Sequence, residues 1–249
     1  MKKLKRIVAG VWNGKSFWCA GWLLALTLSF WAAPRAFHRL FSHLSANQAE
    51  NWHRALAAKQ QELAIPWLDK RPLILMAGDS EIELGHWYDL FDGSRAVRNC
   101  GLSRAKISDV TALVSASKDA RPHAVVLMCG INNLGAGIRV DSCIRDYEKL
   151  LTMVRSHLRP DVVIVLAVMP VRETVMDRAS QRLNQTVNQF NLMLEKCCKN
   201  HGVQFANVNA AIQDDAGGLA AELTTDGLHL NAEGYRRLAA AIAQIKDIR

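Results

Sequence analysis

Two ligand patterns that are typical of zinc proteins are missing from this sequence. It contains six cysteines and eight histidines, but no Cys-x-x-Cys pair and no His-x-x-x-His pair that one helix could present to an ion. A structural or catalytic zinc site therefore has no recognisable ligands. We expect no metal and no other cofactor.

A required disulfide is not expected either. Cys100 and Cys129 each precede a glycine at the end of a predicted strand. If these two strands flank a central one, the thiols lie two strand spacings apart, roughly 9–10 Å, which is beyond the reach of a disulfide. Cys197 and Cys198 are neighbours on a predicted helix, an arrangement that does not favour a bridge.

A basic surface stripe interleaved with aromatic residues is also lacking, although the formal net charge is +8. Residues 1–15 contain five basic side chains and no acidic one: Lys2, Lys3, Lys5, Arg6 and Lys15. This leaves 26 of the 31 basic side chains against 23 acidic ones in the remaining chain, which is a nearly balanced surface. We therefore predict no binding of nucleic acid.

Residues 16–34 form a run of 19 residues without a single charge. As a helix this run extends roughly 28 Å at ~1.5 Å per residue, close to the hydrocarbon thickness of a bilayer. Trp18, Trp22 and Trp31 lie towards its ends, as interfacial aromatic residues do in membrane helices. The alternative is a cleaved signal peptide, but the run is long for one, and Pro34 follows Ala32-Ala33 where cleavage is expected.

We therefore predict a retained transmembrane anchor with a defined orientation. More positive charge precedes the run than follows it, which places residues 1–15 in the cytoplasm and the rest of the chain outside. The predicted location is the periplasmic side of a bacterial inner membrane. Residues 35–70 are predicted as a linker that contains an amphipathic helix over 46–64, and residues 71–249 as the folded domain.

In that domain, short apolar runs alternate with helical patterns, and there are no internal repeats. This alternation predicts an α/β domain with a parallel five-stranded sheet covered on both faces. The strands are expected at 73–77, 96–99, 124–128, 162–168 and 203–205. Helices are expected through 87–91 and over 103–118, 142–158, 178–198 and 231–245.

The first of these strands ends in Gly78-Asp79-Ser80. Five apolar residues without a polar break indicate a fully buried strand. Ser80 then follows at its carboxyl end, where open α/β sheets bind their ligands. It is a candidate nucleophile, although Gly-Asp-Ser is also an ordinary turn with a helix cap.

A serine hydroxyl becomes a good nucleophile only when a base takes its proton. Asp226-Gly227-Leu228-His229 offers such a base just before the last predicted helix. An acid three residues before a histidine, in a turn, can reach the imidazole and fix its tautomer. The alternative is a surface turn with a solvated histidine.

Three donors at the ends of three predicted strands could stabilise an oxyanion. They are the backbone N–H of Ser80, the backbone N–H of Gly101 and the side-chain amide of Asn132. We expect Gly101 to be glycine because its backbone approaches the substrate closely. Asn132 could instead be a loop residue that bonds its own backbone.

These segments occur in the order that is typical of the SGNH (GDSL-like) hydrolases. The sequence resembles this superfamily in Gly78-Asp79-Ser80, Gly101, Gly130-Ile131-Asn132-Asn133 and Asp226-Gly227-Leu228-His229. The resemblance implies a flavodoxin-like three-layer α/β/α sandwich. It also implies Ser80 as nucleophile, His229 as base, Asp226 as the residue that orients it, and Gly101 and Asn132 as oxyanion donors.

Two positions depart from the pattern of the superfamily. Glu81 stands where an apolar residue is usual, and Asn133 where aspartate is common. Neither change removes a catalytic group. We expect Glu81 at the mouth of the pocket, where it repels anionic substrates, or alternatively in solvent at the start of a helix.

The predicted activity is that of a membrane-anchored serine hydrolase acting on carboxylic esters outside the cytoplasm. Its expected substrates are acetyl esters of an envelope glycan, or acyl esters of lipid. Transfer of an acyl group to a sugar hydroxyl uses the same residues and is an alternative. A catalytically silent domain that binds a glycan or a protein is a third, though it would not need all these groups together.

Overall fold

The computed structural model describes residues 48–88, 93–175 and 182–248. Two units are distinguished, Met1–Ala55 and Leu56–Arg249, and the second contains the sheet. Within the described residues, no helix has both the length and the apolar character needed to cross a bilayer. The predicted anchor at 16–34 lies outside these residues and stays a prediction, as does the domain boundary at residue 71.

Five parallel strands form a single sheet in the order β2-β1-β3-β4-β5. This order is the one found in doubly wound sheets of the flavodoxin type, and it reverses direction between β1 and β3. Such a reversal leaves a crevice at the carboxyl ends of the two strands. The strands are β1 (Leu73–Gly78), β2 (Ala96–Gly101), β3 (Ala124–Met128), β4 (Val162–Leu166) and β5 (Gln204–Ala206).

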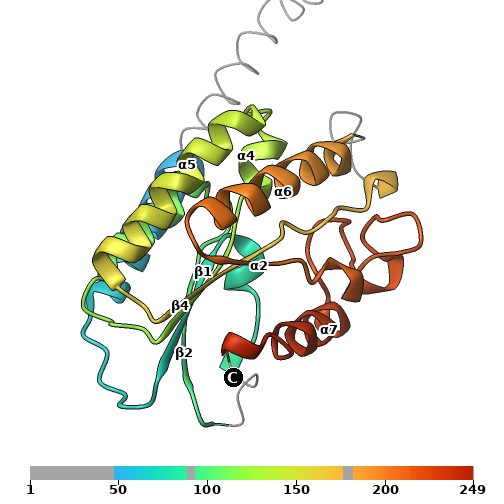
Figure 1. Ribbon diagram of the computed structural model, residues 1–249. Coiled ribbons are helices and arrows are strands. Elements are labelled where there is room, and N and C mark those ends of the chain that lie inside the picture. The colour runs from blue at the N-terminus through green and yellow to red at the C-terminus, as the bar shows by residue number, and fades with distance from the viewer. Residues whose placement is uncertain (1–47, 89–92, 176–181, 249) are drawn as a thin grey trace, which may run out of the picture. The chain divides into compact units, whose positions relative to one another are not determined.

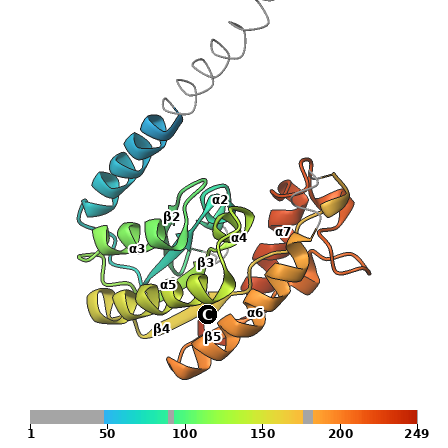
Figure 2. The same ribbon diagram turned by 90° about the horizontal axis from the view of Figure 1, so that it is seen from above.

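Helices cover both faces of this sheet, as the sequence predicted. On one face, apolar side chains of β1, β3 and β4 share a core with Leu238 and Ile242 of α7. On the other face, α3, α5 and α6 pack beside one another (Figure 1 and Figure 2). The helices are α2 (Ser80–Glu83), α3 (Ile107–Ala116), α4 (Ile131–Gly135), α5 (Val140–Met153), α6 (Leu183–Asn200) and α7 (Ala232–Ile242).

Some predicted boundaries are wrong. The helix expected after β1 through residue 91 ends at Glu83, and residues 89–92 lie outside the described residues. The helix expected over 142–158 is α5 followed by a π-helical turn, Val154–Leu158, which Arg159 ends in a left-handed conformation. Periodicity shows which residues face the core, but it does not show the hydrogen-bond partner that ends each helix.

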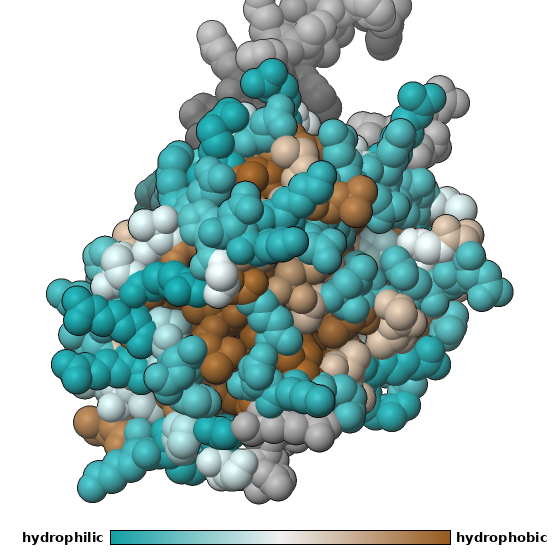
Figure 3. Space-filling model, in the orientation of Figure 1, coloured by the Kyte–Doolittle hydropathy of each residue, from teal (hydrophilic) through white to brown (hydrophobic). Residues whose placement is uncertain are grey.

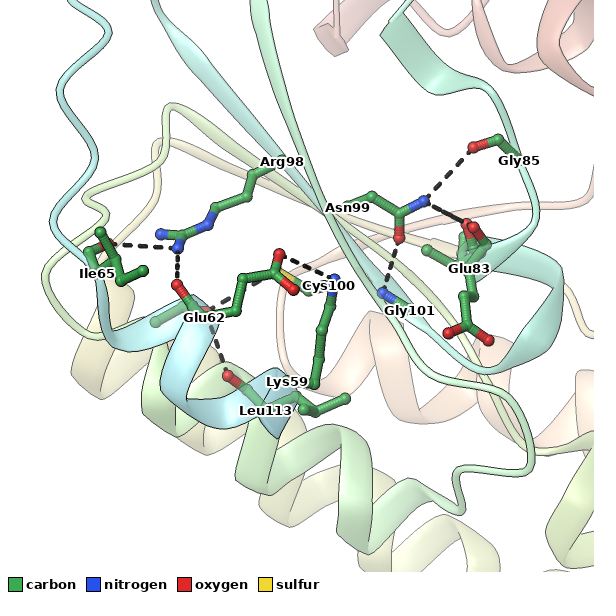
Figure 4. A network of polar contacts seen from close by, with 12 residues as sticks. Lys59, Glu62, Ile65, Glu83, Gly85, Arg98, Asn99, Cys100, Gly101 and Leu113 are labelled. Carbon is green, nitrogen blue, oxygen red and sulfur yellow. Dashed lines mark hydrogen bonds and ion pairs between the residues drawn. The ribbon is translucent and has the colours of Figure 1, made fainter. Parts of the chain in front are cut away.

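Arg98 joins β2 to the end of the helix that occupies residues 48–64 (Figure 4). Its guanidinium donates to the carbonyl oxygens of Glu62, at 2.7 Å, and Ile65, at 3.3 Å, and lies over the ring of Trp67. A cation at the carboxyl end of a helix also complements the helix dipole. These contacts attach residues 62–67 to the sheet.

The surface is largely hydrophilic, with apolar side chains visible between polar ones in the middle of the face in Figure 3. Among the described residues, two large exposed apolar side chains lie close in sequence or in space to the candidate residues Ser80, Asp226 and His229. They are Leu84, directly after α2, and Val175. A Cβ added at Gly227 would lie 2.4 Å from the Val175 side chain. Val175 therefore borders the turn that holds Asp226 and His229.

Candidate active site

Ser80 is the first residue of α2, at the point where the buried strand β1 turns into this short helix. The carboxylate of Asp79 caps the helix by accepting a hydrogen bond from the Glu81 N–H at 3.2 Å. A side chain at Gly78 would place its Cβ 2.0 Å from the Met128 carbonyl oxygen of β3. Glycine is therefore required at the end of β1, and the serine follows it into the crevice between β1 and β3.

The segment 224–230 forms a closed turn before α7. Thr224 and Leu230 pair as an isolated antiparallel bridge, and Gly227 adopts a φ of 84°, which favours glycine. The Oδ1 atom of Asp226 accepts the backbone N–H groups of Leu228, at 2.9 Å, and His229, at 2.8 Å. The turn thus fixes the position of the Asp226 carboxylate independently of its hydrogen bond to the imidazole.

Ser80, His229 and Asp226 are joined by two consecutive hydrogen bonds. His229 Nε2 lies 3.0 Å from Ser80 Oγ, and His229 Nδ1 lies 2.6 Å from Asp226 Oδ2. Partial burial alone would raise the pKa of Asp226, but hydrogen bonds from the His229 ring and from two backbone N–H groups outweigh it and lower this pKa to about 2. Asp226 is therefore ionised at neutral pH and keeps the proton of His229 on Nδ1. Nε2 remains free to accept the serine proton.

Asn132, the second residue of α4, reaches the same crevice from the end of β3. Its Nδ2 donates to the carbonyl oxygen of Ala105 at 3.1 Å. An amide nitrogen has two hydrogens, so one N–H remains for another acceptor. The bond to Ala105 also fixes the direction of the amide, which a preorganised donor requires.

Gly101 lies at the end of β2 as expected, and the structure shows a reason for its being glycine that the sequence did not indicate. A Cβ at this position would lie 2.2 Å from the backbone nitrogen of Glu83, so the close approach is to α2. Its N–H donates to Asn99 Oδ1 at 2.9 Å. To serve an oxyanion, this N–H would have to exchange that bond.

Asn99 is a residue that the sequence analysis missed. Figure 4 shows its side chain between Gly101 and the end of α2. Besides accepting the Gly101 N–H, its Nδ2 lies 2.8, 3.1 and 3.4 Å from the carbonyl oxygens of Ile82, Glu83 and Gly85, which share its two hydrogens. Asn99 thus holds the helix that begins with Ser80. The signal available in the sequence was the polar side chain of Asn99 within a strand that is largely buried.

The two residues that depart from the pattern of the superfamily are both buried. Asn133 accepts the Ile107 N–H at 3.0 Å and so caps α3. Glu81 is 4% exposed, and Tyr235 of α7 donates a hydrogen bond to its Oε2 at 3.1 Å. The two positions expected for Glu81, at the pocket mouth or in solvent, are therefore both wrong. Tyr235 is 154 residues away in sequence, so no local sequence pattern predicts its contact with Glu81.

A group of potential metal ligands lies apart from these residues. Glu148 of α5, Cys197 of α6 and His201, directly after α6, present ligand atoms within 4.8 Å of one another. The sequence patterns considered above did not include a cysteine and a histidine four residues apart. Burial raises the pKa of the Cys197 thiol to about 11. The group makes no contribution to the chemistry discussed below.

Comparison with protein families gives one match that covers most of the site. The model of the family described as GDSL-like Lipase/Acylhydrolase matches residues 78–237, a segment that includes Ser80, Asn132, Asp226 and His229. None of the curated proteins matches the chain.

Solved structures share this fold at low sequence identity. A Streptococcus pneumonia protein named for platelet activating factor has a TM-score of 0.69 and 22% identity, over 80% of this chain and 96% of that one. A GDSL-like lipase from Bacteroides thetaiotaomicron has a TM-score of 0.62 and 22% identity, over 78% and 96%. A catalytic mutant of an acetylxylan esterase from Geobacillus stearothermophilus has a TM-score of 0.57 and 16% identity, over 74% and 99%.

The role of Asn99 predicts a loss of stability in Asn99→Ala. The carbonyl oxygens of Glu83 and Gly85 lose a donor and the Gly101 N–H loses its acceptor. A poorly solvated polar group without a partner costs about 1–3 kcal/mol. Urea unfolding should show this decrease, and amide exchange should become faster at Leu84 and Gly85. The exposed Asn200→Ala should change the free energy of unfolding by less than about 0.5 kcal/mol. Equal stabilities of the two variants would contradict the role of Asn99.

Proposed function

The chain belongs to the GDSL-like lipase/acylhydrolase family and is a carboxylic ester hydrolase, and we propose that Ser80, His229 and Asp226 carry out its reaction. The observation that supports this assignment most directly is the pair of hydrogen bonds from Ser80 Oγ to His229 and from His229 to Asp226. A nucleophile, a base within hydrogen-bond reach and a third group that orients the base are the parts such a mechanism needs.

In the first half of the proposed reaction, Ser80 Oγ attacks the acyl carbon while its proton passes to His229 Nε2. Asp226 stabilises the imidazolium that forms and keeps its ring in place. The oxygen of the tetrahedral intermediate accepts hydrogen bonds from the Ser80 backbone N–H and the Asn132 amide. His229 then returns the proton to the leaving alcohol, and the acyl group stays on Ser80.

In the second half, a water molecule takes the place of the alcohol. His229 accepts a proton from the water, which attacks the acyl carbon. His229 then gives this proton to Ser80 Oγ as the bond between Oγ and the acyl carbon breaks and the carboxylic acid leaves. The same donors bind the oxyanion again. In each half of the reaction His229 accepts one proton and later returns it, so both His229 and Ser80 end in their starting states.

We propose that the substrate is an acyl ester on a large alcohol, either an envelope glycan or a lipid. The side chains of His229 and Asp226 are 33% and 51% exposed, so the base lies open to solvent. A bulky alcohol can approach from that side without entering the protein. The exposed apolar residues Leu84 and Val175 next to the site favour contact with a ring face or an acyl chain.

The proposal also includes attachment of the chain to a membrane. Residues 16–34 would anchor the chain in the inner membrane and hold the hydrolase domain on its periplasmic side. This location fits a substrate that is itself part of the envelope.

Substitution of the nucleophile and the base should show that they act as one unit. Ser80→Ala and His229→Ala are each expected to abolish measurable ester hydrolysis. The double variant should be no worse than either single one, since neither residue is useful alone. Hydrolysis of an acetyl ester by the purified full chain measures this. Ser80→Ala with most of its activity intact would show that another residue is the nucleophile.

The amide of Asn132 should matter mainly in the transition state. Asn132→Ala is expected to lower kcat by roughly 10²–10³ with little change in KM, as the loss of an oxyanion donor does. Steady-state kinetics on a neutral acetyl ester provide both constants. A higher KM with an unchanged kcat would mean that Asn132 binds the ground-state substrate instead.

Topology can be tested with reporters fused after residue 249. Alkaline phosphatase, which folds only outside the cytoplasm, should be active there, and a cytoplasmic reporter should not. The protein recovered from membranes should retain its first 34 residues. An amino-terminal sequence that begins near residue 36 would replace the proposed anchor with a cleaved signal.

A further inference from the structure

Glu81 follows the nucleophile directly, yet its carboxyl group lies in the interior of the protein. The side chain is 4% exposed and reaches from α2 to α7, where Tyr235 donates to its Oε2 at 3.1 Å. Trp87 packs edge-on against the Tyr235 ring with 6.0 Å between ring centroids, and its indole N–H donates to the Ile82 carbonyl at 2.7 Å. The Glu81–Tyr235 contact is thus part of a packed connection between α2 and α7.

The same carboxyl group also meets the loop that carries the base. The backbone N–H of Leu230, the residue after His229, lies close enough to favour the ionised form of Glu81. Oε1, however, has no hydrogen-bond partner among the residues that the structure describes. The residue after Ser80 is therefore in contact with the residue after His229. This contact bears on the distance between the nucleophile and its base.

We propose that protonated Glu81 is a positioning residue of the esterase, which holds the Ser80 turn against α7 and the His229 loop and whose ionisation ends activity at alkaline pH. This inference rests on the proposed roles of Ser80 and His229. It adds a group that does not touch the substrate and acts through the two residues that do.

The surroundings of Glu81 explain why it keeps its proton at neutral pH. Burial, followed by the nearby charges of Asp79 and Asp226, raises the pKa of Glu81 to about 8, against the opposing effect of the Tyr235 hydroxyl. Burial likewise raises the pKa of Asp79 to about 7, but three backbone N–H groups and His229 oppose that rise. Asp79 has more donors for its charge than Glu81, so Asp79 ionises first.

Above pH 8, two buried carboxylates flank Ser80. Asp79 and Glu81 line one small pocket together with apolar side chains, among them Met128, Val168 and Leu228. Such surroundings screen charge poorly, so the two carboxylates repel each other strongly. The turn that carries Ser80 then shifts, and the added negative charge also opposes the oxyanion. Activity decreases with the loss of the Glu81 proton.

The raised pKa also gives a readout that is independent of catalysis. The folded state binds the Glu81 proton more tightly than the unfolded state, where the pKa is near 4.5. The stability that this contributes is fully present below pH 4.5 and is lost as the pH rises towards 8. Wild-type protein should therefore lose stability over this window. Glu81→Gln, which cannot ionise, should lose less.

The test is the pH profile of kcat/KM for three forms of the full chain, measured with a neutral acetyl ester. Wild-type kcat/KM should fall by about tenfold per pH unit above pH 8, as for the loss of one essential proton. Glu81→Gln mimics the protonated carboxyl and should stay within about twofold of its pH 7.5 value up to pH 9.5. In Tyr235→Phe, which removes a hydrogen bond that favours the charged form, the midpoint should move to higher pH.

Glu83→Gln is the matched control, because Glu83 is an exposed carboxylate on the same short helix. It should keep the alkaline decrease of the wild type. The same decrease in Glu81→Gln would overturn the inference, as would a gap in unfolding free energy between wild type and Glu81→Gln that stays constant from pH 5 to 8. Absence of Ser80-dependent hydrolysis in the wild type would instead contradict the proposed function.

Discussion

The hydrogen bond between Ser80 Oγ and His229 Nε2 joins two groups that are 149 residues apart in sequence, and the arrangement of the site depends on it. Each partner is positioned by a different kind of structure. A buried strand and a short helix fix Ser80, whereas a closed turn before α7 fixes His229. The parallel sheet brings both to the carboxyl ends of β1 and β3, the place where an open α/β sheet leaves a crevice.

Three carboxyl groups surround the nucleophile, and their environments separate their tasks. Asp226 is half-exposed and has several donors, so its pKa falls to about 2 and it carries a charge for the imidazolium. Asp79 and Glu81 are buried, so burial raises their pKa values. The Ser80 hydroxyl thus lies near one carboxylate that is ionised at neutral pH, Asp226, and near two carboxyl groups with raised pKa values, Asp79 and Glu81.

The fold class and the candidates Ser80, Asp226 and His229 could be predicted from the sequence, because both depend on local patterns. The apolar run before Ser80 and the spacing of Asp226 and His229 are visible in short segments. What could not be predicted depends on tertiary contacts. The N–H of Gly101 is bound by Asn99, and Glu81 turns away from the crevice to Tyr235. The end of α2 at Glu83 was missed for the same reason, since the side chain of Asn99, from β2, holds it.

Labelling with a fluorophosphonate tests the central claim most directly, because the probe reacts with a serine only when a base activates it. With the purified full chain at neutral pH, we expect one adduct per chain, located on Ser80 by peptide mass spectrometry. His229→Ala should react far more slowly. An adduct on another residue, or equal rates for wild type and His229→Ala, would contradict the account.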